Sequence, residues 1–151
     1  MVEILGKVKG KIFVDLYTPD VAKSNGTMTL QLQKFSLPAQ NVMGVNLPAI
    51  EISEAAIEGD IAGGKFTAKN IVFGKDSKKD DLVAKVTGGI SLSPALDRSN
   101  ADLKAVFEIS SRLSQAFPFL EAILGSARGA DGKYSYTLTG PLSALEPKPC
   151  Q

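Results

Sequence analysis

Apolar and polar residues alternate along most of the chain with the two-residue period of β-strands that bury one face. In residues 2–16 the even positions are apolar or glycine, whereas several of the odd positions are lysine. The same alternation returns in residues 82–92, 101–109 and 134–140. The pattern predicts a mainly β protein built on an antiparallel sheet with one apolar face and one polar face.

Three of the expected strands lose this alternation by one residue near their middle. The slips fall at residues 33–34, between residues 52 and 55, and between residues 68 and 71. A one-residue slip in a flat strand would turn its side chains to the other face, whereas a β-bulge restores the facing and bends the strand. We therefore expect a curved, twisted antiparallel sheet of about seven long, bulged strands.

Turn signals separate these strands. Asn25-Gly26 is a strong hairpin signal, and Gly63-Gly64 predicts a second hairpin turn. Residues 37–48 form a proline-bounded connection, and residues 74–81 form a charged turn. These signals favour strands that follow one another along the sheet in chain order.

One short helical insert is expected near residues 111–125, where apolar residues recur at helical spacing. Pro118 interrupts this spacing, so we expect either a kink or two short helices, the second starting near Pro118. Ser110 or Ser111 can cap the first turn, and Gly125 can end the last. The apolar positions are Leu113, Phe117, Leu120 and Leu124.

The length of 151 residues fits one domain. We assign residues 1–145 to a single β-rich domain. We expect residues 146–151 to be a frayed tail, because proline alternates there with other residues and no apolar periodicity continues. The chain opens without a basic, apolar leader, and we expect it to be a trimmed part of a larger protein.

Composition excludes several function classes. Lys and Arg number 17 against 16 Asp and Glu, a balance unlike the basic surfaces of nucleic-acid-binding proteins. Lys7, Lys9 and Lys11 alternate along the first strand and are expected to line a solvated face. The chain has no His and one Cys, Cys150, so the commonest general base, the commonest metal ligand and an internal disulfide are absent. No stretch approaches the ~20 apolar residues of a membrane helix.

Two motifs that suggest chemistry have simpler interpretations. Residues 59–66 have the glycine and lysine spacing of a phosphate-binding loop, but Phe66 stands where the magnesium-binding Ser or Thr would be. Asp80 and Asp81 lie in the charged turn, where acidic residues are ordinary. We expect a non-catalytic protein without cofactor or metal, an expectation that a perturbed carboxylate pair in a deep cleft would overturn.

The apolar stripes themselves are either an ordinary core or an open groove that holds a lipid or another apolar chain. A sheet with one apolar face must cover that face, by helices or by curling over on itself. The candidate groove residues are Val8, Ile12, Val14, Leu30, Phe66, Val86, Ile90 and Phe107.

Residues 80–92 read Asp-Asp-Leu-Val-Ala-Lys-Val-Thr-Gly-Gly-Ile-Ser-Leu, and residues 94–103 read Pro-Ala-Leu-Asp-Arg-Ser-Asn-Ala-Asp-Leu. With these motifs, the C-terminal two-thirds of the chain resembles the type II secretion system protein N (GspN) family. Residues 131–134 and 138–142 also fit the closing strand of that family, and the resemblance extends in style over residues 1–145.

The resemblance implies a periplasmic β-rich body whose parent protein is anchored in the inner membrane. GspN proteins belong to the machinery that exports folded proteins across the outer membrane, and they are similar in pattern to AsmA-like envelope proteins, whose curved sheets carry lipids. No catalytic residues come with the family. The first hypothesis is therefore a structural component that binds other secretion-system proteins; the alternative is an AsmA-like module that binds or transfers lipid.

These hypotheses make different demands on the apolar face. A structural component can have that face closed by the helix around residues 113–124, whereas a lipid-binding module needs it open. The sequence leaves this choice to the three-dimensional structure.

Overall fold

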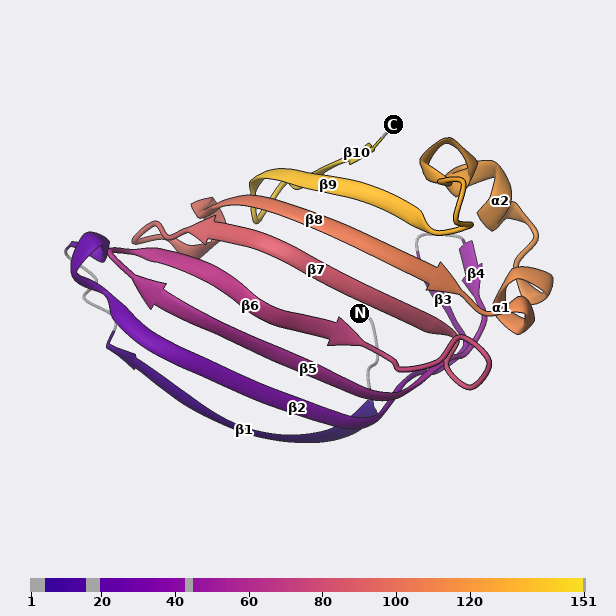
Figure 1. The fold of residues 1–151 in the computed structure, drawn as a ribbon, viewed down its shortest axis with the longest axis horizontal. Helices are drawn as coiled ribbons and strands as arrows, with labels where there is room; N and C mark the ends of the chain where they lie inside the picture. Colours follow the sequence, from indigo (N-terminus) through magenta and orange to yellow (C-terminus); the bar gives the residue numbers. More distant parts are fainter. Residues whose placement is uncertain (1–4, 16–19, 43–44, 151) are drawn as a thin grey trace.

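Eight strands form one antiparallel sheet in the computed structural model, which describes residues 5–15, 20–42 and 45–150 (Figure 1). Their order across the sheet is β1-β2-β5-β6-β7-β8-β9-β10. The strands of this sheet therefore lie side by side in the order in which they occur along the chain. A separate hairpin, β3 (Gln40–Val42) and β4 (Val45–Leu47), connects β2 to β5. The main strands are β1 (Leu5–Asp15), β2 (Asn25–Leu37), β5 (Ile50–Ala62), β6 (Lys65–Phe73), β7 (Leu82–Ser91), β8 (Asn100–Ile109), β9 (Tyr134–Pro141) and β10 (Glu146–Pro149).

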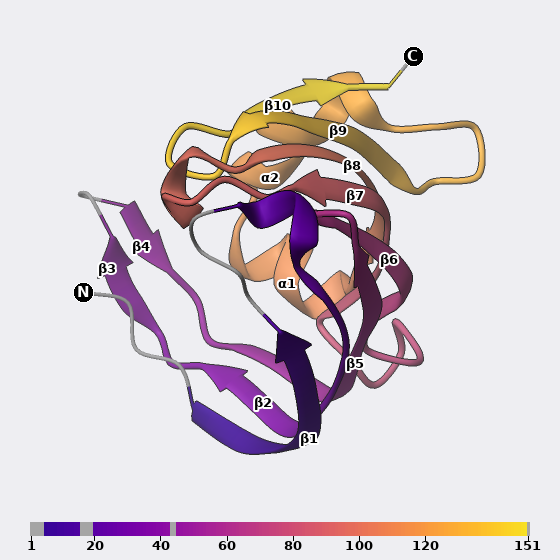
Figure 2. The ribbon, with the colours of Figure 1, turned by 90° about the vertical axis from the view of Figure 1, so that its left-hand side faces the viewer.

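The sheet curls into a half-pipe. Viewed from one end, it rises from β1 through β6 to β9 and β10, and α1 (Ser111–Ala116) and α2 (Phe119–Leu124) lie at the far end of the sheet (Figure 1 and Figure 2). The helices, the β3–β4 hairpin and the turn of residues 74–81 share one end of the molecule, which we call the helical end (Figure 1). The predicted curved, mainly β architecture is confirmed.

The predicted slips are irregularities of the sheet. In β2, Gln33 and Lys34 are both exposed, Lys34 has a φ of 53°, and the pairing with β1 shifts register opposite this point, between Leu5 and Lys7. A residue in this left-handed region breaks the strict alternation of the strand. The side chains on either side of the slip consequently return to the same face.

The alternation of β2 and that of β5 are interrupted at adjacent positions of the sheet. Ser53 and Glu54 of β5 are successive exposed residues, and the β2–β5 register stays continuous because β2 slips beside them. In β6 the register with β7 shifts between Thr67 and Ile71. These irregularities bend the strands and accompany the curvature of the half-pipe.

The helical insert consists of two short helices. Of the two predicted alternatives, a kinked helix or two short helices, the second is the one observed. Ser110 caps α1, its hydroxyl accepting a hydrogen bond of 3.1 Å from the Leu113 amide. The first helix ends at Ala116 with Phe117 as its C-cap, and the second starts directly after Pro118. Gly125 follows α2 and begins a short 3-10 turn, Gly125–Ala127.

Two local predictions differ from the structure. Asn25 and Gly26 do not form a turn but open β2, because a 3-10 helix at Val21–Lys23 reverses the chain earlier, with Asp20 accepting from the Ala22 amide at 3.2 Å. The Asn25 side chain instead bonds the Lys23 carbonyl at 2.9 Å.

The predicted frayed tail is ordered over Glu146–Pro149, which form β10 and pair with β9. The Cys150 amide donates to Ser135 O at 2.9 Å, and strand alternation therefore turns the nitrogens of Pro147 and Pro149 away from β9. Those two positions need no ladder donor, which is why a proline-rich segment can be an edge strand here.

Little of the apolar surface is fully enclosed. The chain exposes 9623 Å², about 30% more than the roughly 7,400 Å² expected of a folded monomer of 15.9 kDa. Among the described residues the buried apolar set is Ile52, Ala55, Phe66, Ala101, Leu113, Phe117, Ala127 and Tyr134. Most other apolar side chains of the main sheet are half-buried rather than fully enclosed.

Candidate functional site

The apolar side chains of the main sheet form continuous rows that cross it from strand to strand. Because directly paired residues of antiparallel strands project to the same face, the register alone assigns each row to one side. The first row is Leu32, Ala55, Phe73, Ala84, Phe107 and Tyr134; the second is Leu30, Ile57, Ile71, Val86, Ala105 and Tyr136; the third is Gly26, Ile61, Phe66, Ile90, Ala101 and Gly140. We call the side that carries these rows the inner face.

The inner face is the concave side of the half-pipe. Along β2, residues 26–32 alternate between half-buried on the inner face and exposed on the other. Curvature brings side chains on a concave side together, which lowers their exposure without a covering layer. The rows contain aliphatic, aromatic and glycine residues, and their polar atoms are the hydroxyls of Tyr134 and Tyr136.

The structure brings together the predicted groove residues whose side chains it describes. Leu30, Val86 and Phe107 are half-buried in the rows, and Ile90 pairs with Phe66, which is buried. The side chains of the other three candidates lie outside the description. By register, Val8, Ile12 and Val14 of β1 stand opposite Leu32, Met28 and Gly26.

Gly59 leaves space on the inner face for the ring of Phe66 on the neighbouring strand. A Cβ placed on Gly59 would lie 2.2 Å from the Phe66 ring, so no larger residue fits without displacing that ring. Gly59 stands opposite Met28 on one side and Ala68 on the other. The floor at this level is therefore formed by small side chains and the face of one aromatic ring.

Aromatic residues and the helices close the helical end of the inner face. The Phe107 ring stacks on Tyr134, with centroids 5.4 Å apart, and lies 6.1 Å from Tyr136. The Tyr134 hydroxyl donates to Glu121 Oε2 of α2 at 2.9 Å, and Arg128 holds the other carboxylate oxygen at 2.6 Å. Burial and this hydrogen bond raise the pKa of Tyr134, whereas hydrogen bonds from Tyr134 and Arg128 lower the pKa of Glu121.

The buried carboxylates of Asp80 and Asp81, which we call the carboxylate lock, hold the turn of residues 74–81 against the sheet. Asp80 is 3% exposed, and its carboxylate accepts from the Ser53 amide at 2.6 Å, the Ser53 hydroxyl at 3.1 Å and the Lys75 amide at 2.8 Å. Burial alone would raise the pKa of Asp80, but the hydrogen bonds from Lys75 and Ser53 outweigh it and lower the pKa.

Asp81 extends the lock to the first helix. It is 4% exposed and accepts from the Glu51 amide at 2.8 Å, the Ser110 hydroxyl at 2.9 Å and Arg112 Nε at 3.0 Å, while Arg112 Nη2 binds its second oxygen. Burial opposes ionisation, but the hydrogen bonds from Arg112, Glu51 and Ser110 lower the pKa of Asp81. One carboxylate thus joins β5, the turn and the cap of α1.

The interpretation of Asp80 and Asp81 as ordinary acidic residues of a charged turn is wrong, because both are buried. Apart from the nearby Lys75, the partners named above are about 30 residues away in sequence, so no local pattern reveals them. Both carboxylates remain ionised and saturated with donors, the opposite of a carboxyl held protonated for general-acid work. Their geometry is that of a structural lock.

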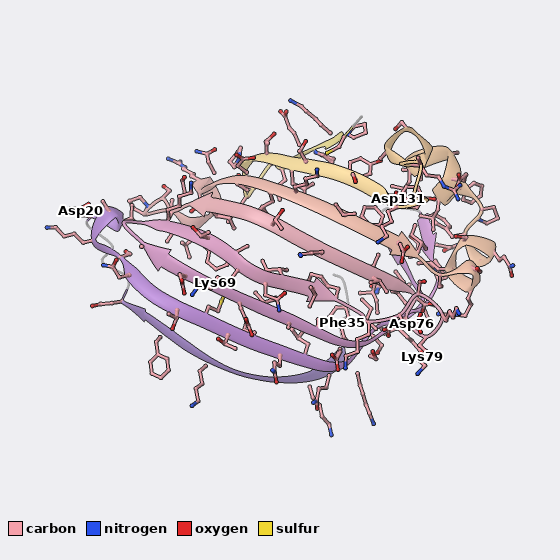
Figure 3. The ribbon with its side chains drawn as sticks, viewed as in Figure 1. Asp20, Phe35, Lys69, Asp76, Lys79 and Asp131 are labelled. Atoms are coloured by element: carbon pink, nitrogen blue, oxygen red, sulfur yellow. The ribbon has the colours of Figure 1, made fainter. Side chains whose placement is uncertain are left out.

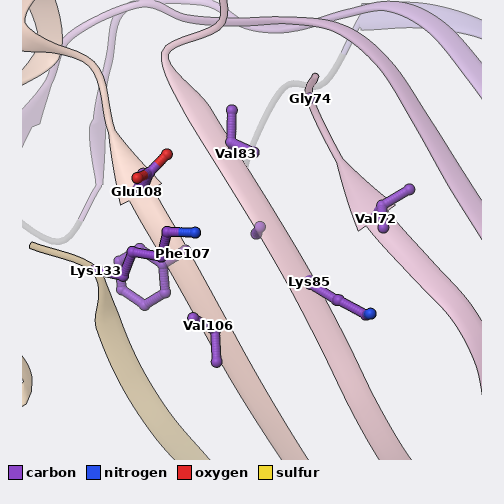
Figure 4. Close-up of a pocket in the computed structure, with 9 residues that line it drawn as sticks. Val72, Gly74, Val83, Lys85, Val106, Phe107, Glu108 and Lys133 are labelled. Carbon is purple, nitrogen blue, oxygen red and sulfur yellow. The ribbon is translucent and has the colours of Figure 1, made fainter. Parts of the chain in front are cut away.

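The outer face carries charged side chains. Lys7, Lys11 and Asp15 of β1 are exposed there, and Lys69 pairs with Asp60 at 2.6 Å (Figure 3). A shallow hollow of about 350 Å³ lies over β6, β7 and β8, where Val72, Val83 and Val106 line it beside Lys85, Glu108 and Lys133 (Figure 4).

The phosphate-loop spacing at residues 59–66 is a hairpin, as predicted: β5 ends at Ala62, Gly63 and Gly64 turn with φ of 58° and 74°, and β6 starts at Lys65. The described ranges contain no group of three or more His, Cys, Asp or Glu placed to hold a metal ion. Across the same ranges, no helix is long and apolar enough to cross a membrane.

No family model, curated protein or solved structure matches this chain. The resemblance to GspN proteins therefore stays a prediction from the sequence.

Proposed function

We propose that this protein is a non-catalytic lipid-binding module that holds acyl chains against the inner face of its half-pipe. The observation that carries the proposal is the set of apolar rows that crosses the sheet while the face remains half-buried. Covering such a surface with a ligand is favourable by about 25 cal/mol for each Å² of apolar area removed from water.

The chemistry of the face favours acyl chains over a folded partner. A protein interface includes about one hydrogen bond per 100–200 Å², whereas the rows offer almost no free donor or acceptor. The Tyr134 hydroxyl, one of the few polar atoms, is already bonded to Glu121. A hydrocarbon chain needs no directional contacts and matches this lack of polar groups.

The dimensions also agree. A 13-residue strand such as β2 or β5 is about 43 Å long at ~3.3 Å per residue. The acyl chains of one leaflet span about 15 Å, half of a ~30 Å bilayer core. An acyl chain can therefore lie along the half-pipe from its middle to the aromatic residues at the helical end.

The main sheet has two free edges. In the described ranges the edge strands β1 and β10 do not pair with each other, so the half-pipe is not closed into a barrel. A headgroup can remain in water beside these edges while the acyl chains contact the sheet. The AsmA-like pattern of the sequence supports the same function, and a role in type II secretion rests on the sequence resemblance alone.

The test uses two matched substitutions on opposite faces. Val86 on the inner face of β7 and Val106 on the outer face of β8 are both half-buried on neighbouring central strands. Val86→Asp places a charge among the apolar rows, and Val106→Asp makes the identical change on the other side. Val86→Trp and Val106→Trp repeat the comparison by filling space without charge.

Protein purified from a bacterial envelope is analysed by native mass spectrometry and lipid extraction, and binding is measured with a phospholipid that carries a fluorescent acyl chain. We expect phospholipid at a fixed ratio in the wild type, at least tenfold weaker binding for the Val86 variants, and wild-type binding for the Val106 variants. Circular dichroism checks that each variant is folded. A lipid-free wild type that also fails to bind the fluorescent phospholipid, or equal losses for both positions, would refute the proposal.

A further inference from the structure

The two edges of the main sheet differ in their capacity to accept another strand. At one edge, β10 turns the nitrogens of Pro147 and Pro149 outward, and proline has no N–H to donate to a ladder. At the other edge, β1 contains no proline and pairs, in the described ranges, with β2 alone. The sheet can therefore be extended at β1 and not at β10.

This difference restricts how copies of the chain can associate. Head-to-tail addition would need the β1 edge of one copy to pair with the β10 edge of the next, where the outward donors are missing. Pairing β1 with β1 uses the open edge of both copies and closes the assembly as a two-fold dimer. An antiparallel pair with its axis perpendicular to the sheet also keeps both inner faces on the same side.

The charges of β1 then select the register. With Lys9, Gly10 or Lys11 at the two-fold axis, lysines stand directly opposite lysines, an arrangement that destabilises strand pairs. With Ile12 at the axis, residues 9–15 pair, Lys11 stands opposite the partner's Phe13, and Lys9 stands opposite the partner's Asp15. Placing Phe13 at the axis also avoids lysine pairs but shortens the pairing to residues 11–15 of the described strand.

An otherwise unexplained exposed residue fits this register. Phe13 is 69% exposed on a face whose neighbours Lys11 and Asp15 are exposed charged residues. A lysine opposite an aromatic side chain contributes both apolar contact and attraction to the ring face. The two-fold repeats this contact, so each dimer contains it twice.

We infer that the protein forms a two-fold dimer by antiparallel pairing of β1 with β1 of a second copy, with Ile12 at the axis. The dimer joins the two sheets into one, and their inner faces become a single apolar surface. The inference goes beyond the proposed lipid binding and does not depend on it, because the pairing uses backbone groups and outer-face side chains.

The first test measures the dimer dissociation constant by analytical ultracentrifugation. Phe13→Lys places lysine opposite lysine twice, and a total of roughly 1.4 kcal/mol from the two pairs corresponds to a tenfold weaker dimer. The matched control, Thr67→Lys, adds the same charge to an exposed position of central strand β6 and leaves dimerisation unchanged. Combining Lys11→Glu with Phe13→Lys makes each contact an ion pair and restores the dimer.

The second test identifies which residues of the two β1 strands lie opposite each other in the dimer. In a Cys150→Ser background, Ile12→Cys places two Cα atoms about 4.5–5.5 Å apart across the axis, within the range that a disulfide spans. Phe13→Cys and Val14→Cys place their counterparts farther apart. We expect oxidative cross-linking of the Ile12 variant alone. A monomer at all concentrations, equal weakening by Thr67→Lys, or preferential cross-linking at Phe13 would overturn the inference.

Discussion

Replacing Asp81 with asparagine tests whether the carboxylate lock fastens the helical end to the sheet. Oδ1 of Asp81 accepts from Ser110 and Arg112 Nε, and Oδ2 accepts from the Glu51 amide and Arg112 Nη2. In Asp81→Asn the retained oxygen can keep the first pair, but the new NH₂ group faces two donors. The substitution changes almost no volume, so its effect reports on hydrogen bonding and charge.

The expected loss follows from these contacts. A buried backbone amide left without an acceptor costs about 1–3 kcal/mol. The Arg112 side chain is 58% exposed, so solvent screens the ion pair and the loss comes mainly from the unsatisfied amide. We therefore expect Asp81→Asn to lower the free energy of unfolding by about 1–3 kcal/mol, a substantial part of the 5–15 kcal/mol typical of a domain.

Urea unfolding followed by far-ultraviolet circular dichroism measures this loss, since the chain has no Trp. The control is Asp102→Asn, an exposed position on the outer face of β8, expected to change stability by less than about 0.5 kcal/mol. Hydrogen exchange should become faster in α1 and residues 74–81 before the β7–β8 pair. Equal losses for the two variants would show that the lock does not stabilise the fold.

The pH dependence of stability provides a second readout of the same lock. The pKa values of Asp80 and Asp81 are lowered by folding, so the stabilisation is present above their ordinary pKa near 3.8 and is lost as the pH falls through the lower folded values. We expect stability to fall below about pH 4. Asp81→Asn should lose part of this acid dependence, and an unchanged acid limb would contradict the assignment.

Three further substitutions test the inner face and the helical end. Gly59→Val should destabilise the protein by about 1–3 kcal/mol in urea unfolding, because its Cβ would meet the Phe66 ring. Gly125→Ala, at a helical backbone position with open space around it, should be neutral or stabilise by up to about 1 kcal/mol. Tyr134→Phe should leave neutral-pH stability lower by about 0.5–1.5 kcal/mol. It should also remove the part of the alkaline loss above about pH 10 that arises from the raised pKa of this tyrosine.

The strands, their slips and the divided helical insert could be predicted because each depends on nearby residues. The two-residue alternation defines the inner face of β7 and β8, and paired exposed residues such as Gln33 and Lys34 mark the irregularities directly. The candidate groove residues with described side chains come together for the same reason: in a sheet of sequential neighbours, alternation and register place them on one side.

The remaining features depend on contacts that the local sequence does not record. Asp81 looks like any acidic turn residue until Glu51 and Ser110 approach it from other elements. The Asn25-Gly26 signal is overridden by the 3-10 turn that Asp20 caps. The ordered tail requires knowing which way the nitrogens of Pro147 and Pro149 point, and that direction is fixed only when β10 meets β9.

The chain-order arrangement of the main sheet has a consequence for how this architecture can change in length. Apart from β2 and β5, which flank the β3–β4 hairpin, every pairing in the main sheet joins strands that follow one another in the chain. Inserting or deleting one hairpin would widen or narrow the half-pipe by two strands and leave the register of the other strand pairs unchanged. Repeat proteins, whose units contact only their neighbours, change length in the same way. The width of the half-pipe can therefore evolve in steps of two strands, independently of the carboxylate contacts that hold the helical end.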